Sequence, residues 1–248
     1  MFARFAEKRV RASANIVLFV ICSTRPVAAQ PSGGAAAPLT AFDSVKVHAL
    51  LRERLPCLGC HTDHGTGGTI GPDLTHVANR RTSAYIAAMI ENPQKVVPGA
   101  AMPRIAMPLA MRVLVTRYFA GGAPLDATPA TGSARAIVIR APTNGAALYA
   151  RYCAACHGEQ GGGDGVNARH LPVRPAVHAN AALMSTKSDA RLFDAIAVGG
   201  YPMGRSVMMP PFGETLSREE IWLLVRHLRT LCRCTGPAWS ASAGGAAR

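Results

Sequence analysis

Apolar residues recur at helical spacing in several segments of the chain. The clearest segment follows Ser217, where a capping box with Glu220 precedes apolar residues that return every three or four positions through Leu228. The same spacing predicts helices at 83–91, at 106–120, at 190–198 after Ser188-Asp189, and after a cap at Asn144 or Thr143. No segment shows a convincing period-two pattern of a strand. The sequence therefore predicts an all-α protein with long loops between its helices.

The first 29 residues have the layout of a secretory signal peptide. Basic residues precede a short apolar run over 14–22, and the small residues Ala28 and Ala29 follow. This run is too short to cross a bilayer, which takes about 20 residues, and no later stretch is long and apolar enough. We therefore expect cleavage after Ala29, loss of Cys22 with the peptide, and a mature protein in the periplasm.

The low aromatic content and the net charge of the chain bear on which classes of protein are compatible with this sequence. The chain has 248 residues, of which 49% are hydrophobic but only 6% aromatic, so two ordinary cores would be thinly filled. The formal net charge of +13 is compatible with nucleic acid, but no recognition motif is present and secretion argues against that partner. The basic charge could guide docking onto an acidic redox partner, or reflect only an arginine-rich composition.

Two copies of the motif C-x-x-C-H carry the candidate chemistry. They are formed by Cys57, Cys60 and His61 and by Cys153, Cys156 and His157. In c-type haem attachment, the two thiols add to the vinyl groups of one porphyrin and the histidine ligates its iron. A zinc site would need four ligands, and a redox C-x-x-C needs no adjacent histidine. The sequence therefore predicts two covalently bound haem c groups, whose bulk would fill the aromatic-poor cores.

The duplicated motif also indicates the domain organisation. A stretch with Pro124, Pro129, Gly132 and Ser133 between the motifs has the composition of a linker. We expect a signal peptide at 1–29, a first domain at 40–122, a linker at 123–140, a second domain at 141–236 and a tail at 237–248. Each domain is near the size at which a bound cofactor contributes to stability.

A Met-Pro pair follows each motif and could supply the second axial ligand of the iron. Proline fixes φ and holds a loop extended, as a thioether ligand across a haem requires. The candidates are Met102 and Met107 in the first domain and Met209, Met208 and, more distantly, Met203 in the second. Met209 directly precedes Pro210, whereas Pro108 after Met107 suits the first turn of the next helix. We expect surface or hydrogen-bonding roles for His64, His76, His170 and His178.

These features resemble the class I cytochromes c in their tandem di-haem form. In that family an N-terminal helix leads into C-x-x-C-H, a Gly-Pro segment and a Met-Pro loop follow, and a C-terminal helix packs on the first. Gly71-Pro72 after the first motif and Pro98-Gly99 before Met102 match this order. The resemblance implies two small helical domains, each wrapped around a haem, and favours Met102 as the ligand.

The resemblance also implies roles for individual residues near the histidines. The carbonyl of Pro72 would accept a hydrogen bond from His61 and so orient its ring. Pro172 and Pro175 are both candidates for the matching role toward His157. Gly145 would be the small residue of the first helix that packs against the last.

One-electron transfer is the function that His/Met ligation implies, because both axial positions are filled. The redox partner would be a dehydrogenase or a terminal oxidase, with the chain as a free shuttle or as a subunit docked to a membrane complex. The alternative is a di-haem enzyme of the cytochrome c peroxidase or thiosulfate dehydrogenase type, which needs an opening iron or a Cys ligand. The spare thiols, Cys232 and Cys234, could be a disulfide, free thiols, or a metal or partner contact.

Overall fold

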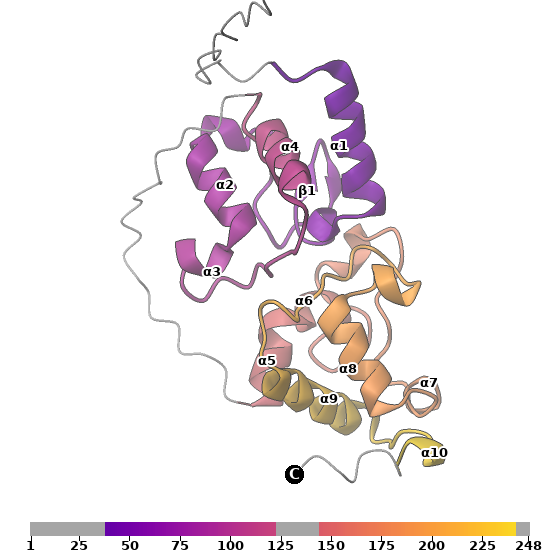
Figure 1. Cartoon of the computed structure of the whole chain (residues 1–248). Helices are drawn as coiled ribbons and strands as arrows, with labels where there is room; N and C mark the ends of the chain where they lie inside the picture. The colour runs from indigo at the N-terminus through magenta and orange to yellow at the C-terminus, as the bar shows by residue number, and fades with distance from the viewer. Residues whose placement is uncertain (1–37, 123–143, 242–248) are drawn as a thin grey trace, which may run out of the picture. The chain divides into compact units, whose positions relative to one another are not determined.

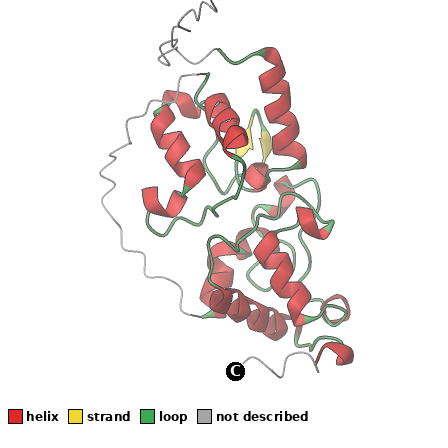
Figure 2. Cartoon of the chain, viewed as in Figure 1, coloured by secondary structure: helices red, strands yellow, loops and turns green. Residues whose placement is uncertain are grey.

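The structure is a computed structural model that describes residues 38–122 and 144–241. The expected signal peptide at 1–29 and the expected linker at 123–140 lie outside these residues. The described residues belong to one compact unit. We refer to 38–122 as its first half and to 144–241 as its second half. Both are built of helices joined by long loops (Figures 1 and 2), as the sequence predicts.

The first half packs three longer helices around a small apolar core. Its helical elements are α1 (Ala41–Glu53), η1 (Pro56–Gly59), η2 (Val77–Asn79), α2 (Ser83–Glu91), α3 (Pro93–Val96) and α4 (Leu109–Phe119). A capping box between Thr40 and Asp43 starts α1. The core side chains include Val47, Leu51, Ile86, Val115 and Phe119, so α1, α2 and α4 each contribute to it.

A short hairpin in the first half corrects the expectation that the chain has no strands. Strands β1 (Thr62–Asp63) and β2 (Thr66–Gly67) pair antiparallel. His64 and Gly65 connect them with φ of 47° and 75°, the left-handed backbone that a two-residue hairpin turn needs. Strands of two residues are too short to show alternation in a sequence, and for this reason the pattern missed them.

Helix α4 begins later than predicted. The sequence placed a helix over 106–120 with Pro108 in its first turn, but the helix starts at Leu109 and ends at Phe119. Pro108 has φ of −56° and ψ of 145°, so it is the extended residue that precedes the helix. Proline also disfavours helical backbone at the residue before it, here Met107, so the helix does not extend back across Pro108.

The second half follows the predicted helices closely. Its helical elements are α5 (Gly145–Tyr152), α6 (Ala154–His157), η3 (Ala168–His170), α7 (Ala181–Met184), α8 (Asp189–Val198), η4 (Tyr201–Met203), α9 (Arg218–Cys232) and α10 (Ala238–Ala241). Asn144 caps α5, which resolves the choice between Asn144 and Thr143. Ser188 caps α8, and the capping box of Ser217 and Glu220 starts α9, both as predicted.

Gly145 allows α5 to lie directly against α9 (Figure 1). A Cβ at this position would lie 2.3 Å from the carbonyl oxygen of Leu223 and 2.9 Å from Cβ of His227. Both distances are shorter than side-chain carbons adopt, so any larger residue would separate the helices. The close approach expected at Gly145 is therefore present.

We expect Gly145→Ala to lower the free energy of unfolding by about 1–3 kcal/mol, the usual cost of overpacking. The added methyl group meets backbone of α9, which cannot move aside as a flexible side chain would. Chemical denaturation followed by circular dichroism measures the change. Ala146→Leu, at an exposed position of the same helix, is the matched control and should change stability little. Equal stability of the two variants would contradict this packing argument.

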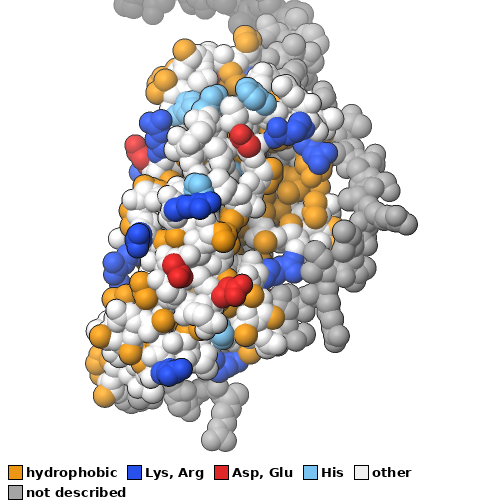
Figure 3. All heavy atoms as spheres, turned by 180° about the vertical axis from the view of Figure 1, so that it is seen from behind, with side chains coloured by type: hydrophobic (Ala, Val, Ile, Leu, Met, Phe, Trp, Pro, Cys, Tyr) orange, Lys and Arg blue, Asp and Glu red, His pale blue; other side chains and the backbone are white. Residues whose placement is uncertain are grey.

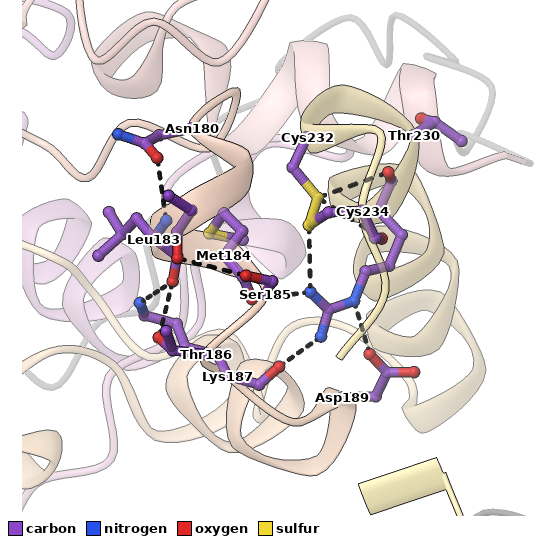
Figure 4. Close-up of a disulfide and its surroundings, with 12 residues drawn as sticks. Asn180, Leu183, Met184, Ser185, Thr186, Lys187, Asp189, Thr230, Cys232 and Cys234 are labelled. Atoms are coloured by element: carbon purple, nitrogen blue, oxygen red, sulfur yellow. Dashed lines mark hydrogen bonds and ion pairs between the residues drawn. A yellow bond between two sulfur atoms is a disulfide. The ribbon is translucent and has the colours of Figure 1, made fainter. Parts of the chain in front are cut away.

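The described C-terminal segment contains a disulfide between Cys232 and Cys234 (Figure 4). Arg229 lies beside it, with Nη1 3.7 Å from Sγ of Cys234. The same guanidinium donates to Oδ1 of Asp189 at 2.8 Å and to the carbonyl of Met184 at 2.9 Å. Of the states left open for the two cysteines, the structure shows the disulfide. It lies at the end of α9, where Arg229 joins that helix to α7 and α8.

Within 38–122 and 144–241, we find no helix with the length and apolar character needed to cross a membrane.

Candidate functional site

Both C-x-x-C-H motifs line one cavity of about 1060 Å³. The cavity wall includes all six motif residues, Cys57, Cys60, His61, Cys153, Cys156 and His157. Most of the remaining wall is aliphatic or aromatic and comes from loops and helices of both halves. The fold thus brings the two motifs, far apart in the sequence, to the same apolar space.

The first motif lies on a tight turn that presents its thiols to the cavity. Pro56 starts η1, and the amide of His61 donates to the carbonyl of Cys57 at 2.9 Å. Burial raises the pKa of the Cys57 thiol to about 11. Burial and then the nearby Cys156 raise the pKa of Cys60 to about 12. Both thiols are therefore protonated at neutral pH in the protein without haem.

A backbone carbonyl orients the ring of His61. Nδ1 of His61 donates to the carbonyl oxygen of Pro72 across 2.8 Å, so the hydrogen bond expected from the resemblance is present. Gly71 allows this approach, because a Cβ there would lie 2.6 Å from the imidazole. Burial lowers the pKa of His61, which favours the neutral ring. With Nδ1 as the donor, Nε2 is left with a free lone pair, as a metal ligand requires.

A backbone carbonyl also orients the histidine of the second motif, but it belongs to a different type of residue. His157 ends the short helix α6, and its Nδ1 donates to the carbonyl oxygen of Ala176 at 2.9 Å. Neither Pro172 nor Pro175, the two residues considered from the sequence, is the acceptor. Any residue can supply a backbone carbonyl, so the presence of Pro72 as the acceptor for His61 does not predict a proline as the acceptor for His157.

His178 supports the second motif in a way that the sequence did not indicate. Its ring stacks on that of His157 with centroids 4.1 Å apart and planes 14° from parallel. Nδ1 of His178 lies 3.0 Å from the hydroxyl of Tyr149, which fixes its ring. His178 therefore packs on His157 itself. The other loop histidines considered above, His64, His76 and His170, do not line the cavity.

All candidate methionines line the cavity, but they pack differently. Met107 and Met208 both pack against the buried core of the first half, although Met208 belongs to the second half. Met102 lies on a loop that Gln94 holds by donating to the carbonyls of Met102 at 2.6 Å and Ala100 at 3.4 Å. The carbonyl of Met209 accepts a hydrogen bond from the amide of Gly200 at 2.9 Å. The loops before Pro103 and Pro210 are thus held by specific contacts.

The charge around the cavity fits a group with carboxylates. Its lining includes seven cationic side chains, Arg80, Arg81, Arg151, Arg174, Lys187, Arg191 and Arg205, and no Asp or Glu among the described residues. Nε of Arg151 is buried without a hydrogen-bond partner, although such a donor is normally satisfied. A hollow with apolar side chains, and with Lys and Arg above and below it, is visible in Figure 3. The cavity therefore suits an apolar macrocycle with anionic propionates, and the residues present fit haem.

Comparisons with known families agree with this site. Residues 51–113 match the family described as cytochrome c. Residues 140–228 match the family described as cytochrome C oxidase, cbb3-type, subunit III. The chain is a c-type cytochrome with two cytochrome c domains in tandem. These domains imply covalently bound haem c, and they make this cytochrome an electron-transfer protein.

Two solved structures are similar to parts of the cytochrome. The "KustC0563 c-type cytochrome" is 31% identical, covers 36% of this chain and 98% of its own, and has a TM-score of 0.29. The "Kuenenia stuttgartiensis reducing HAO-like protein complex Kustc0457/Kustc0458" is 20% identical over 70% of this chain and 79% of its own, with a TM-score of 0.30. At these TM-scores neither likeness supports an argument about function. None of the curated proteins matches the chain.

Proposed function

We propose that this cytochrome carries single electrons between redox partner proteins in the periplasm through two covalently bound haems. The observation that carries the proposal is the paired geometry of the cavity, where each motif histidine is oriented by a backbone carbonyl and a Met-Pro loop lines the same space. The proposed thioether residues are Cys57, Cys60, Cys153 and Cys156, and the proposed axial ligands are His61 with Met102 and His157 with Met209.

The residues of the chain would bind and orient the haem and exclude water from it. Bound haem supplies an iron that changes oxidation state by one electron. Thioether bonds to the motif cysteines would hold the group, and the hydrogen bonds to Pro72 and Ala176 would hold the rings of His61 and His157. Methionine as the second ligand raises the reduction potential, and the cations of the cavity wall would neutralise the propionates.

Packing supports the choice of methionine in each domain. The side chains of Met107 and Met208 already pack against the core of the first half, and each would lose part of this contact on reaching an iron. Met102 and Met209 have no such contact with the core clusters. We therefore propose Met102 and Met209 as the ligands, the same pair that the sequence favours.

The disulfide weakens the enzyme alternative. A thiosulfate dehydrogenase mechanism would use a cysteine as the ligand of its catalytic haem, but Cys232 and Cys234 are bonded to each other and do not line the cavity. A peroxidase would need an iron with an open position. Peroxide turnover, or a high-spin haem in the resting protein, would favour that enzyme class over the electron carrier.

The proposed location and partners are supported by the N-terminus and by the second family match. Residues 1–29 have the composition of a cleaved signal peptide. The family matched by 140–228 is described as an oxidase subunit. We propose a dehydrogenase or a terminal oxidase as the partner, with the cytochrome as its subunit or as a shuttle that docks to it. The excess of Lys and Arg over Asp and Glu, which persists after loss of residues 1–29, would favour an acidic docking surface and association that weakens with salt.

Intact-mass and redox measurements on the protein from a periplasmic fraction test the proposal. We expect a mature chain that starts at Gln30 with the added mass of two haems. In the oxidised form we expect the far-red charge-transfer band of Met–Fe ligation, and one electron taken up reversibly per haem. A single haem, an intact N-terminus, or the absence of reversible reduction would each contradict the corresponding part of the proposal.

A further inference from the structure

The side chain of Asn167 is a fully buried polar group that contacts both haem-attachment motifs. Its exposed fraction is 0%. Nδ2 donates to the carbonyl oxygen of Gly59 in the first motif at 2.7 Å and lies 3.3 Å from Sγ of Cys156 in the second. Oδ1 accepts from the backbone amide of Thr69 at 2.9 Å. Asn167 thus belongs to the second half and hydrogen-bonds twice to backbone of the first.

These partners leave only one orientation of the amide. The Gly59 carbonyl can only accept and the Thr69 amide can only donate, so nitrogen and oxygen of the side chain cannot be exchanged. A buried amide without partners would cost about 1–3 kcal/mol, and here both ends are satisfied. The backbone amide of Asn167 also donates to the carbonyl of Ala155, inside the second motif, at 2.9 Å. The residue is therefore fixed to the second motif while its side chain holds the first.

Glycines in the first half make room for this contact. A Cβ at Gly68 would lie 2.7 Å from Oδ1 and 2.8 Å from Nδ2 of Asn167. A Cβ at Gly59, between the two cysteines of the first motif, would lie 2.2 Å from the carbonyl oxygen of Met208. The backbone of the first motif therefore lies directly against Asn167 and against the segment that precedes Met209.

We propose that Asn167 is a positioning residue that couples the two haems of this cytochrome. It links the carbonyl of Gly59, next to Cys60, to the sulfur of Cys156 through one side chain. The inference rests on the proposed function, since it needs a haem at each motif. The step that it serves moves one electron from the reduced iron of one haem to the oxidised iron of the other, with no bond made or broken.

Coupling between two sites is reciprocal, so the oxidation state of each haem should shift the potential of the other by the same amount. The Asn167 hydrogen bonds fix the two attachment segments to each other, and this would keep the separation of the attached haems constant. Without the Asn167 hydrogen bonds, the two attachment segments would no longer be held at one fixed position relative to each other. Because the Coulomb interaction between two charged sites falls with their separation, we expect the mutual shift of potential to become smaller and electron exchange between the haems to slow.

Asn167→Leu tests this role, because leucine has a similar size and makes no hydrogen bonds. The measurement is a redox titration followed by NMR, in which signals of the two haems are observed separately. We expect two attached haems and unchanged Met–Fe bands, but a smaller mutual shift in potential than in the unaltered protein. Asn180→Ser is the matched control, since Asn180 only caps α7 in the second half, and it should retain the shift.

Gly68→Ala provides a second variant from the opposite side of the contact, in case the leucine variant folds poorly. Its methyl group would lie 2.7 Å from both Oδ1 of Asn167 and the carbonyl oxygen of Gly59, so it would displace the Asn167 side chain while every residue of the second half is kept. We expect the same decrease of the mutual shift. Haems that titrate independently in the unaltered protein, or an unchanged shift in both variants, would overturn the inference and leave the proposed function intact. Failure of the unaltered protein to take up electrons reversibly would instead refute the proposed function.

Discussion

Replacing Cys153 and Cys156 with serine is expected to give a protein that carries one haem where the unaltered cytochrome carries two. Serine hydroxyls do not form the thioether bonds that attach the porphyrin, and His157 alone would hold haem only by coordination. Intact mass after denaturation separates covalent from coordinated haem. The second half should also lose stability, because its share of the cavity would have no covalently held group to fill it.

Two further variants make this result specific. Exchange of Cys57 and Cys60 for serine should remove the other haem in the same way and leave the haem of the second domain. Exchange of Cys232 and Cys234 for serine should leave both haems in place, since this pair forms a disulfide outside the cavity. Two haems in either motif variant, or one haem in the disulfide variant, would show that the cysteines are assigned to the wrong roles.

Replacing Met209 with alanine is expected to lower the reduction potential of the second haem and to remove its far-red Met–Fe band. The potential should fall by on the order of 0.1 V or more, because axial ligands set haem potentials over a span of about 0.8 V. An open position at that iron should also allow small ligands such as carbon monoxide to bind. Spectroelectrochemistry of the purified protein measures both the band and the potential.

The neighbouring Met208 offers a matched control for this variant. Met208→Ala removes a side chain of the same type one position earlier, but from the core of the first half. We expect it to retain both far-red bands and to lower the free energy of unfolding by about 1–2 kcal/mol, because a partly buried side chain loses less apolar contact on truncation than a fully buried one. If instead Met208→Ala loses the band and Met209→Ala keeps it, the ligand is Met208.

The sequence predicts those features that depend on neighbours in the chain. The caps at Ser188 and Ser217 and the two attachment motifs are local patterns, and each is found where it was expected. Pro72 was identified because a related family places a proline there. The predicted start of α4 was three residues too early because the fixed φ of proline fits both a first helical turn and the extended residue before a helix, and Pro108 is the latter.

Other features depend on contacts between distant segments and left no local pattern. Ala176 has no side-chain chemistry that marks it as the acceptor for His157. Asn167 looks like any polar loop residue until the chain brings Gly59 and Thr69 to it. The role of His178 likewise becomes apparent only in the fold, which stacks its ring on that of His157. The separations run from 19 residues, between His157 and Ala176, to 108 residues, between Asn167 and Gly59, and no sequence spacing indicates such contacts.

The position of Met208 has a consequence for how such a protein can evolve. A duplicated domain is normally a module that can be lost, exchanged or fused elsewhere, because its core is made of its own residues. Here a side chain of the second half packs against the core of the first, and the backbone that carries it lies against Gly59. Recombination at the segment between the halves would remove the contact of Met208 with the core of the first half. Substitutions at Gly59 and Met208 should therefore covary between related proteins, and the two halves should diverge in sequence together.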